Sequence, residues 1–408
     1  MKDSFDVVIV GGGMVGATLA CALGGTGLTV ALLENQHPTA FAADQPHDLR
    51  VSALSIASKQ ILASIGAWEG VLARRLCPFR RMRVWETAGD TEFCSDDIGA
   101  HELGFIVENR VTQLALWDCL QRFDNIELIC PAALKKINYS ASQVGAHSSL
   151  ELADGRQLAA KVLVAADGGQ SRVREAVGLG VTGWDYKQHA LVVYVETQYG
   201  QQDITWQRFV PSGPQAFLPL SGHYASLVWY NSPDEISRLK SLSKEALLQA
   251  LMATFPDCLG QLTRVIATAN FPLKRQHAQS YVKSGVALVG DAAHSINPLA
   301  GQGANIGFLD AAALAEVLVA AHKNGQKIDD IKVLKTYEKM RRAENLKMMT
   351  LMDAFYQVFS NQVLPLKFLR NLGLGVAERV TPLKTKLMRS AMGLDGNLPK
   401  LARGLGVK

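Results

Sequence analysis

Closely spaced cysteine pairs, metal-binding histidine motifs and a strong net charge are all missing from this sequence of 408 residues. Its six cysteines are scattered without a CxxC spacing, so we predict free thiols in a reducing compartment rather than a disulfide framework. The nine histidines form no HExxH motif and no cluster with cysteine, so we predict no bound metal. A net charge of +5 is small for this length and gives no general reason to expect nucleic-acid binding.

A membrane-spanning segment is also not predicted. Residues 7–33 carry no charge, but seven glycines interrupt this run, and the start of the chain lacks the basic region of a signal sequence. No other uncharged apolar run approaches the roughly 18 residues of a spanning helix. Since 48% of the residues are hydrophobic and 19% are charged, the chain should fold as a globular protein. We therefore predict a cytoplasmic protein that is soluble or attached peripherally to the membrane.

The N-terminus contains a strand, a glycine turn, a helical stretch and a second strand. Residues 5–10 and 28–33 are short apolar runs, typical of buried parallel strands. Between them lies a GxGxxG motif made of Gly11, Gly13 and Gly16. Such glycines allow a tight turn and a close backbone approach to a pyrophosphate. The helix that follows offers free N–H groups and a partial positive charge to the phosphates.

Glu34 lies 21 residues after Gly13, at the end of the second strand. A carboxylate at this place accepts hydrogen bonds from an adenosine ribose and repels a 2′-phosphate. The N-terminal unit therefore predicts dinucleotide binding, with a structural glycine turn and a solvated Glu34 as the alternative. It does not distinguish FAD from NAD.

Two further apolar strands each end at a pair of glycine and aspartate. Residues 161–166 lead into Asp167-Gly168, and residues 285–289 lead into Gly290-Asp291. Asp291 at a strand end could hold a second sugar-like chain, the ribitol that FAD has and NAD lacks. Asp167 has an alternative role as the cap of the turn after its strand.

The loop at residues 297–305 (NPLAGQGAN) leads into a helix. Its turn would aim a helix N-terminus at a ring system. A positive helix end near the pyrimidine part of a flavin stabilises the negative charge of the reduced form. This third motif therefore favours FAD as the cofactor.

The rest of the chain divides by its pattern. Between about 181 and 275, shorter alternating segments with Gly and Pro turns predict a mixed or antiparallel sheet, and from about 302 onward the pattern is mostly helical. We expect a discontinuous FAD-binding domain (1–70, 101–180 and 276–330), a substrate-binding sheet domain (71–100 and 181–275) and a C-terminal helical segment with a basic tail (331–408).

Three ordered motifs carry a resemblance to a known family. DG followed by SxVR at 167–174, GDAAH at 290–294 and PLxGQGxN at 298–305 resemble the class A flavoprotein monooxygenases built on the p-hydroxybenzoate hydroxylase fold. The resemblance runs from about residue 4 to 350. It implies an α/β fold, with a Rossmann-like FAD-binding domain, an inserted mixed-sheet substrate domain and a C-terminal helical segment.

The resemblance implies FAD as cofactor, O2 as co-substrate and NAD(P)H or another reductant as electron source. Reduced flavin would react with O2 to give a C4a-hydroperoxide, which attacks an electron-rich ring carbon. The protein would position the ring and keep the site dry.

The resemblance also assigns single residues to the cofactor. For Arg50 the alternative is an arginine on the surface without a role in binding. His294 is not assigned to the cofactor; we interpret it as a packing residue at the start of a helix. The ADP half is assigned to Gly11, Gly13, Gly16 and Glu34, the ribitol and pyrophosphate region to Asp291, the isoalloxazine border to Pro298, Gly301, Gly303 and Asn305, and further FAD contacts to Arg50, Gln113 and Asp167.

Longer stretches resemble the ubiquinone-biosynthesis hydroxylases in particular, and among them most closely the group that hydroxylates demethoxyubiquinol. A polyprenylated phenol or benzoquinol is therefore the expected substrate. Hydroxylation of a 2-polyprenylphenol or a 2-polyprenyl-6-methoxyphenol, a flavin reductase of the same fold, and a non-catalytic FAD-bound scaffold of a quinone-biosynthesis complex remain alternatives. The stretches are residues 50–58, 104–110, 184–192, 216–220, 225–230, 297–312 and 370–380, and the likeness to the demethoxyubiquinol group rests on 205–220 and 370–380.

Candidates for contact with the substrate ring come mainly from the predicted sheet. For the aromatic candidates and for His189, packing in the protein core is the alternative. The substrate-binding candidates are Phe217, Pro219 and Trp229, and the candidates for a catalytic role are His189, Tyr230 and Pro298.

The C-terminal segment is basic. Residues 363–408 contain nine Lys and Arg against two acidic residues, a net charge of +7, with apolar residues nearby. Such a segment suits an anionic membrane surface at the inner face of the membrane, or a partner protein of a quinone-biosynthesis complex. A docking helix with a solvated basic tail is the alternative. A homo-oligomer is also compatible with the sequence.

Overall fold

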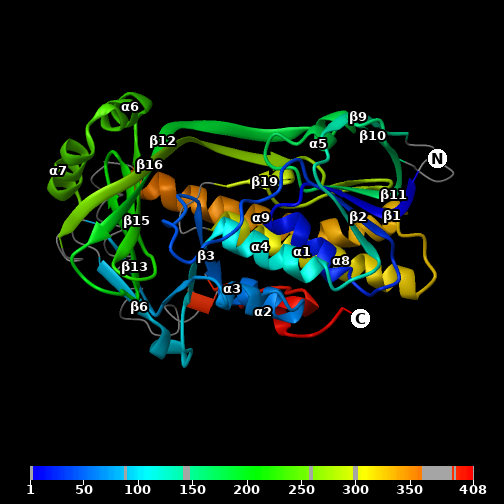
Figure 1. Cartoon of the computed structure of the whole chain (residues 1–408), viewed down its shortest axis with the longest axis horizontal. Helices are drawn as coiled ribbons and strands as arrows, with labels where there is room; N and C mark the ends of the chain where they lie inside the picture. The colour runs from blue at the N-terminus through cyan, green and yellow to red at the C-terminus, as the bar shows by residue number, and fades with distance from the viewer. Residues whose placement is uncertain are drawn as a thin grey trace.

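The computed structural model of the chain describes residues 3–86, 90–140, 148–256, 261–296, 302–360, 388–389 and 392–407 (Figure 1). These residues form an α/β fold with two large sheets, one smaller sheet and helices packed among them. This architecture of a mostly parallel sheet, a mixed sheet and packed helices confirms the α/β fold class expected from the sequence.

The first sheet is mostly parallel. Its strand order is β17-β18-β11-β1-β2-β8, with β10 and β9 attached beside β11. The apolar runs of the sequence become its central strands, whose residues are buried because helices cover the sheet. Its strands are β1 (Asp3–Val10), β2 (Val30–Leu33), β8 (Ile126–Ile129), β9 (Leu134–Asn138), β10 (Ser148–Leu152), β11 (Gln157–Ala165), β17 (Val282–Lys283) and β18 (Val286–Leu288).

The helices beside this sheet pack on one another. α1 contacts α4 and α8, and α8 contacts α9. By length and composition, Gly303–Lys323 within α8 could cross a membrane, but 78% of its apolar window is buried inside the protein, as in the core helix of an α/β layer. The helices are α1 (Met14–Ala22), α4 (Asn109–Leu120), α5 (Arg172–Ala176), α8 (Gln302–Lys323) and α9 (Ile331–Ser360).

The second sheet is mixed, with the order β19-β16-β12-β15-β14-β13-β5-β6. Its long strands β12 and β16 run from this sheet to a position beside the first one (Figure 1). α6 (Pro233–Ser241) and α7 (Lys244–Thr254) cover one face. The strands are β5 (Arg81–Trp85), β6 (Asp90–Cys94), β12 (Val181–Thr197), β13 (Ile204–Val210), β14 (Gly213–Pro219), β15 (Tyr224–Asn231), β16 (Leu262–Ala278) and β19 (His294–Ser295).

The opposite face of the second sheet contacts a three-stranded sheet of β3 (Val51–Ser55), β7 (Gly104–Glu108) and β4 (Cys77–Phe79). Buried apolar residues fill the space between the two sheets, and Met388 and Met392 from near the C-terminus contribute to it. The remaining elements are α2 (Ile56–Ser64), α3 (Trp68–Leu72) and the short helices η1 (Ser95–Ile98), η3 (Gly290–Ala292) and η5 (Lys400–Arg403).

Candidate functional site

The ends of the parallel strands bring the three sequence motifs to one edge. In the register of the first sheet, Val10 pairs with Leu33 and with Ala165, and Ala165 pairs with Leu288. The residues that follow these strands therefore emerge side by side at the carboxyl edge, where open α/β sheets bind their ligands. They are Gly11, Glu34, Asp167 and Asp291, which the sequence analysis assigned to one cofactor.

The glycine turn leaves space in front of α1. Gly11 has a φ of +107°, and a Cβ atom on Gly16 would lie 1.9 Å from the carbonyl oxygen of Gly11. A Cβ atom on Gly13 would meet no protein atom within 4 Å, so protein packing does not require glycine there. Because Gly13 also supplies no side-chain cap to α1, the helix N-terminus can receive the phosphates of a dinucleotide.

Glu34 is oriented by the turn itself. Its Oε2 accepts a hydrogen bond from the backbone N–H of Gly12 at 2.8 Å, and its Oε1 accepts one from Asn35 at 2.7 Å. A carboxylate oxygen accepts more than one hydrogen bond, so both oxygens still have capacity for ribose hydroxyls.

Gln113 and Trp117 hold the same turn from α4. The Gln113 amide and the Trp117 indole both donate to the carbonyl oxygen of Gly12 at 2.9 Å. The structure thus places Gln113 next to the expected phosphate site, where it fixes the peptide between Gly12 and Gly13. Sequence reasoning missed Trp117, although it lies four residues after Gln113 and so on the same helix face.

The two carboxylate oxygens of Asp167 differ in their hydrogen bonding. Its Oδ2 accepts a hydrogen bond from Val173 N at 3.2 Å, which agrees with the capping alternative. Its Oδ1 is buried and has no hydrogen-bond partner in the described part of the protein. Since a buried carboxylate oxygen is costly to leave unpaired, a donor group of a bound cofactor fits here.

Arg174 joins the motif at 167–174 to the GDAAH motif at 290–294, a role that sequence reasoning missed. Its guanidinium donates to the carbonyl oxygen of Ala292 at 2.8 Å and to that of Gly169 at 2.9 Å. It is buried, and burial lowers its pKa. Arg174 is the arginine of the SxVR signature, so its position in that motif was the signal that could have identified it.

Asp291 lies on η3, directly after β18, with Arg50 nearby. Its side chain is exposed, yet the protein around it raises its pKa, while the charges of His294 and Arg50 act against that increase. Surrounding protein thus removes part of the water from this carboxylate, while one side of it stays open to solvent. Arg50 is therefore close enough to Asp291 for its charge to act on that carboxylate. The residue is also exposed, as the alternative of a surface arginine assumed.

A buried ionic network lies behind Asp291. His294 Nε2 is 2.5 Å from Asp310 Oδ2, and the same oxygen accepts from Gly290 N at 3.2 Å. Asp310 Oδ1 accepts from Arg341 at 3.0 Å and from Asn345 at 2.9 Å. Burial by itself would raise the pKa of Asp310, but His294, Arg341 and Asn345 lower it overall.

His294 of the GDAAH motif and Asn305 of the PLxGQGxN motif both have defined protein partners. His294 was read as a packing residue at a helix start, but it lies in β19, because it pairs with His277 of β16 and with the buried Asp310. Asn305 is buried and donates to Ala53 O at 2.9 Å, while its oxygen accepts from Ser55 N and the Ser58 hydroxyl. Its side chain thus ties α8 to β3 and α2.

Three residues complete the expected border of the ring system. Gly303 lies in the first turn of α8, where an added Cβ atom would make only an ordinary contact with Ile296 at 3.9 Å. Pro298 and Gly301 lie outside the described residues. Their proposed role next to the ring system stays a prediction.

The structure places two substrate candidates away from the cofactor edge. Phe217 and Trp229 lie on the face of the second sheet that α6 and α7 cover, where they pack around Trp206 and Phe255. Strand alternation directs these side chains into that core, so their assignment to the substrate site is corrected to core packing.

The other candidates from this sheet lie in mixed surroundings. Tyr230 is buried on the opposite face and packs near Met352 of α9. Pro219 is buried at the end of β14 and pairs with Ala225. His189 is half-buried and pairs with Asn231 and Pro272 in neighbouring strands. A catalytic role for His189 or Tyr230 stays a prediction.

Comparison with known proteins shows the family to which this chain belongs. Residues 4–351 match the family described as FAD binding domain. The 3-demethoxyubiquinol 3-hydroxylase of Escherichia coli strain K12 is 43% identical over 390 residues, which cover 95% of this chain and 98% of that protein. The ubiquinone hydroxylase UbiL of Rhodospirillum rubrum is 38% identical and covers 98% of this chain and 93% of its own. The solved p-nitrophenol 4-monooxygenase of Pseudomonas putida has a TM-score of 0.77 at 20% identity, covering 97% and 99% of the two chains.

Proposed function

Because this chain belongs to the family with the FAD binding domain, we propose that it hydroxylates the ring of a polyprenylated benzoquinol in ubiquinone biosynthesis. It is an FAD-dependent monooxygenase that uses O2 and a reductant. The observation that carries the substrate is the 43% identity to a demethoxyubiquinol hydroxylase over nearly the full length of both proteins. Demethoxyubiquinol is therefore the substrate we assign.

The residues of the carboxyl edge fit FAD. We assign the pyrophosphate to the N-terminus of α1, the adenosine ribose to Glu34, and the ribitol to Asp291, with Arg50 as a cation beside it. The unpaired oxygen of Asp167 supports a second polar contact. When bound, reduced FAD supplies the chemistry that activates O2.

The ring of the substrate requires an apolar, water-free space next to this edge. The buried cluster between the second sheet and the three-stranded sheet offers an apolar wall for that space: it includes Leu220, Phe79 and Ile106, and Val51 and Ala53 of β3 pack against it. β3 begins directly after Arg50 and is tied to α8 through Asn305. We therefore place the substrate ring between this cluster and the FAD.

Mass spectrometry of quinone intermediates tests the substrate assignment. A strain without this chain should accumulate demethoxyubiquinol or its quinone, and the wild-type chain should restore ubiquinone. Accumulation of a 2-polyprenylphenol or of a 2-polyprenyl-6-methoxyphenol would reassign the ring position. Full rescue by Asp291→Ala protein that has lost its FAD would favour the non-catalytic scaffold instead.

We also propose that the chain contacts an anionic membrane or a partner through residues 363–408. The polyprenyl tail of the substrate is lipid-soluble, and this segment carries a net charge of +7. Most of the segment lies outside the described residues. Holoenzyme should co-sediment with vesicles containing phosphatidylglycerol but not with neutral phosphatidylcholine vesicles, and equal binding to both would remove the electrostatic argument.

A further inference from the structure

Two methionines near the C-terminus belong to the apolar wall assigned to the substrate ring. Met388 is 2% exposed and Met392 is 4% exposed, and both lie in the buried cluster that contains Phe79, Ile106 and Leu220. They come from a part of the chain far from the strands that supply those three residues. We call Met388 and Met392 the methionine pair.

The methionine pair is held in one helical turn. Met392 N donates a hydrogen bond to Met388 O at 2.9 Å, which is the spacing of an α-helical hydrogen bond. Residues four positions apart in such a turn lie on the same side of it. Leu394 N donates to Arg389 O at 2.8 Å and closes the turn. Both side chains therefore enter the cluster from the same side.

This turn packs closely against the start of α2 (Figure 1). Ala57 N donates to Met392 O at 3.3 Å. The next residue, Gly393, has a φ of +69°, and an added Cβ atom there would lie 3.0 Å from the Cβ of Ala57 and 3.6 Å from the Oγ of Ser55. Glycine thus allows both the backbone conformation and the close approach.

The same turn of α2 also contacts the cofactor motif. The hydroxyl of Ser58 and the backbone N–H of Ser55 donate to Asn305 Oδ1, at 2.7 and 2.9 Å. Asn305 belongs to the motif that the sequence assigns to the border of the isoalloxazine. Met392 and Asn305 therefore contact one turn of α2, which brings the methionine pair close to the cofactor motif.

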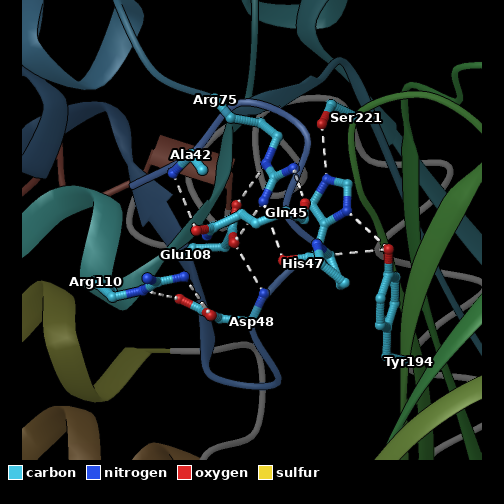
Figure 2. Close-up of polar contacts among 10 residues, drawn as sticks. Ala42, Gln45, His47, Asp48, Arg75, Glu108, Arg110, Tyr194 and Ser221 are labelled. Atoms are coloured by element: carbon cyan, nitrogen blue, oxygen red, sulfur yellow. Dashed lines mark hydrogen bonds and ion pairs between the residues drawn. The ribbon is translucent and has the colours of Figure 1, made fainter. Parts of the chain in front are cut away.

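The β3 and β7 side of the cluster is fixed by charged residues. Glu108, the last residue of β7, accepts two hydrogen bonds from Arg75 at 2.8 and 2.9 Å and one from Asp48 N at 2.8 Å (Figure 2). The Asp48 carboxylate in turn accepts two hydrogen bonds from Arg110, each at 2.8 Å. Bidentate pairs of this kind hold the chain that leads into β3 in one geometry. The unbranched methionine side chains are the adaptable side of the wall.

Methionine suits contact with a substituted aromatic ring. Its unbranched side chain adjusts to an irregular shape, and its sulfur makes favourable contacts with ring edges. Demethoxyubiquinol carries a methyl and a methoxy group on its ring. A 2-polyprenylphenol carries neither, and a 2-polyprenyl-6-methoxyphenol lacks the methyl group. The ring methyl group therefore distinguishes the proposed substrate from both alternatives.

We propose that Met388 and Met392 are specificity-determining residues that contact the ring methyl group of the bound benzoquinol. The inference rests on the proposed function. One additional methyl or methylene group in an apolar pocket changes the binding of a transition state roughly 10- to 200-fold. Contact with the methionine pair thus makes the site select a methylated ring over a ring without that group.

The test variants are Met388→Ala and Met392→Ala, which shorten the two side chains, and Met392→Leu, which keeps an apolar side chain of similar volume. Leu401→Ala is the matched control. Leu401 is buried in the same C-terminal part of the chain, but it packs in the cluster of the first sheet, and its carbonyl oxygen accepts from Ser64 at 3.0 Å. Its truncation weakens the packing of this part of the chain without changing the wall of the ring site.

The first measurement compares a short-tailed demethoxyubiquinol with its analogue that lacks the ring methyl group, on FAD-loaded enzyme. The wild type should have a kcat/KM roughly tenfold or more higher for the methylated quinol. Met388→Ala and Met392→Ala should lower this ratio roughly tenfold, while Met392→Leu and Leu401→Ala keep it. An unchanged ratio in both methionine-to-alanine variants, or an equal decrease in Leu401→Ala, would overturn the assignment.

This ratio does not depend on the fraction of folded enzyme, because both quinols are measured on the same preparation. If Met392→Ala yields no holoenzyme, Met392→Val replaces it, since valine leaves a smaller cavity. It should lower the ratio in the same direction. An unchanged ratio in Met392→Val would then count against the assignment in the same way.

The second measurement needs no turnover. Oxidised holoenzyme is titrated with 2-geranyl-6-methoxyphenol and with its 3-methyl derivative, and binding is followed by the change in flavin absorbance. The wild type and Leu401→Ala should bind the methylated phenol roughly tenfold more tightly, and Met392→Ala should bind both phenols with similar Kd. The same preference in wild type and Met392→Ala would refute the role of the methionine pair alone. A wild type that prefers the methylated phenol but forms no hydroxylated product from the quinol would refute the proposed function alone.

Discussion

At the residue scale, Gly13 and Gly16 allow the effect of a glycine on folding to be distinguished from its effect on cofactor binding. An added Cβ atom meets no protein atom at Gly13, whereas at Gly16 it lies 1.9 Å from a backbone oxygen. The backbone of Gly13 has a φ of −69°, which alanine adopts without strain. The same substitution at the two glycines should therefore have different effects.

We expect Gly13→Ala to keep the stability of the apoprotein and to weaken FAD binding at least tenfold, because the methyl group occupies the space in front of α1. Gly16→Ala should destabilise the apoprotein itself. Fluorescence titration with FAD and thermal unfolding of the apoprotein measure the two effects. Normal FAD affinity of Gly13→Ala would move the pyrophosphate away from this turn.

Asp310 is the residue on which the polar network behind the cofactor edge depends. It is fully buried and contacts His294, Arg341, Asn345 and Gly290 N. Removing one partner of a buried ionic network leaves the others uncompensated, so Asp310→Asn should lower the free energy of unfolding by about 3 to 5 kcal/mol. Denaturant unfolding measures this loss. Asp291→Asn is the control, because its exposed side chain should affect FAD content far more than stability.

His47 and His277 give the protein a predictable sensitivity to acid. Both are buried, and burial is the largest cause that lowers the pKa of each to about 4. The unfolded chain takes up protons on these side chains below about pH 6.5, while the folded chain does so only near pH 4. Stability is therefore complete above pH 6.5 and falls as the pH drops toward 4.

In that pH window, we expect these histidines to make unfolding take up about two protons, so that the free energy of unfolding falls as the pH falls. His47→Asn should reduce this uptake by about one proton. Equilibrium unfolding at half-unit steps from pH 7.5 to 4 measures the slope. A slope that is the same in wild type and variant would show that His47 is not held neutral by the fold.

At the element scale, the parallel strands were the most predictable part of the molecule. Residues 5–10 and 161–166 are apolar runs that end at glycine or aspartate, and such runs become buried strands whose ends meet at one edge. The second strand begins at Val30 rather than at residue 28, a small error at an element boundary. The motifs were therefore placed correctly relative to the sheet.

The mixed sheet was less predictable because sequence pattern does not say which face a strand residue occupies relative to distant elements. Val181–Thr197 forms one long strand, although only residues 191–196 have a strand-like apolar pattern. The first half of this strand pairs with β16 beside the first sheet. Phe217 and Trp229 were assigned to the wrong face for the same reason. The junction of His47 with Tyr194 joins residues 147 positions apart and has no local signal.

Asn305 links elements, and its loss should affect both stability and cofactor binding. Its side chain connects the start of α8 to β3 and to Ser55 and Ser58 at the start of α2. Asn305→Ala removes these hydrogen bonds from buried groups, and each group that is left unsatisfied costs about 1 to 3 kcal/mol. Thermal unfolding and FAD content should fall together in this variant. Unchanged FAD content despite lower stability would mean that the α8 terminus does not depend on this contact.

At the scale of the whole molecule, the arrangement of the two sheets gives the chain its function. The carboxyl edge of the first sheet presents the cofactor motifs, and the second sheet supplies an apolar face next to β3. The division into a discontinuous FAD-binding domain, a substrate-binding sheet domain and a C-terminal segment remains a proposal. The strand order supports it, since the two large sheets draw their strands from separate stretches of the chain, apart from the two-residue β19 of the second sheet.

The most direct test of the account is the fate of molecular oxygen. FAD-loaded protein, a reductant and a short-tailed demethoxyubiquinol are incubated under ¹⁸O2, and the product is analysed by mass spectrometry. The account predicts one ¹⁸O atom in a new ring hydroxyl of each product molecule. A product without label, or consumption of reductant that leaves the ring unchanged, would contradict ring hydroxylation and favour a flavin reductase of the same fold.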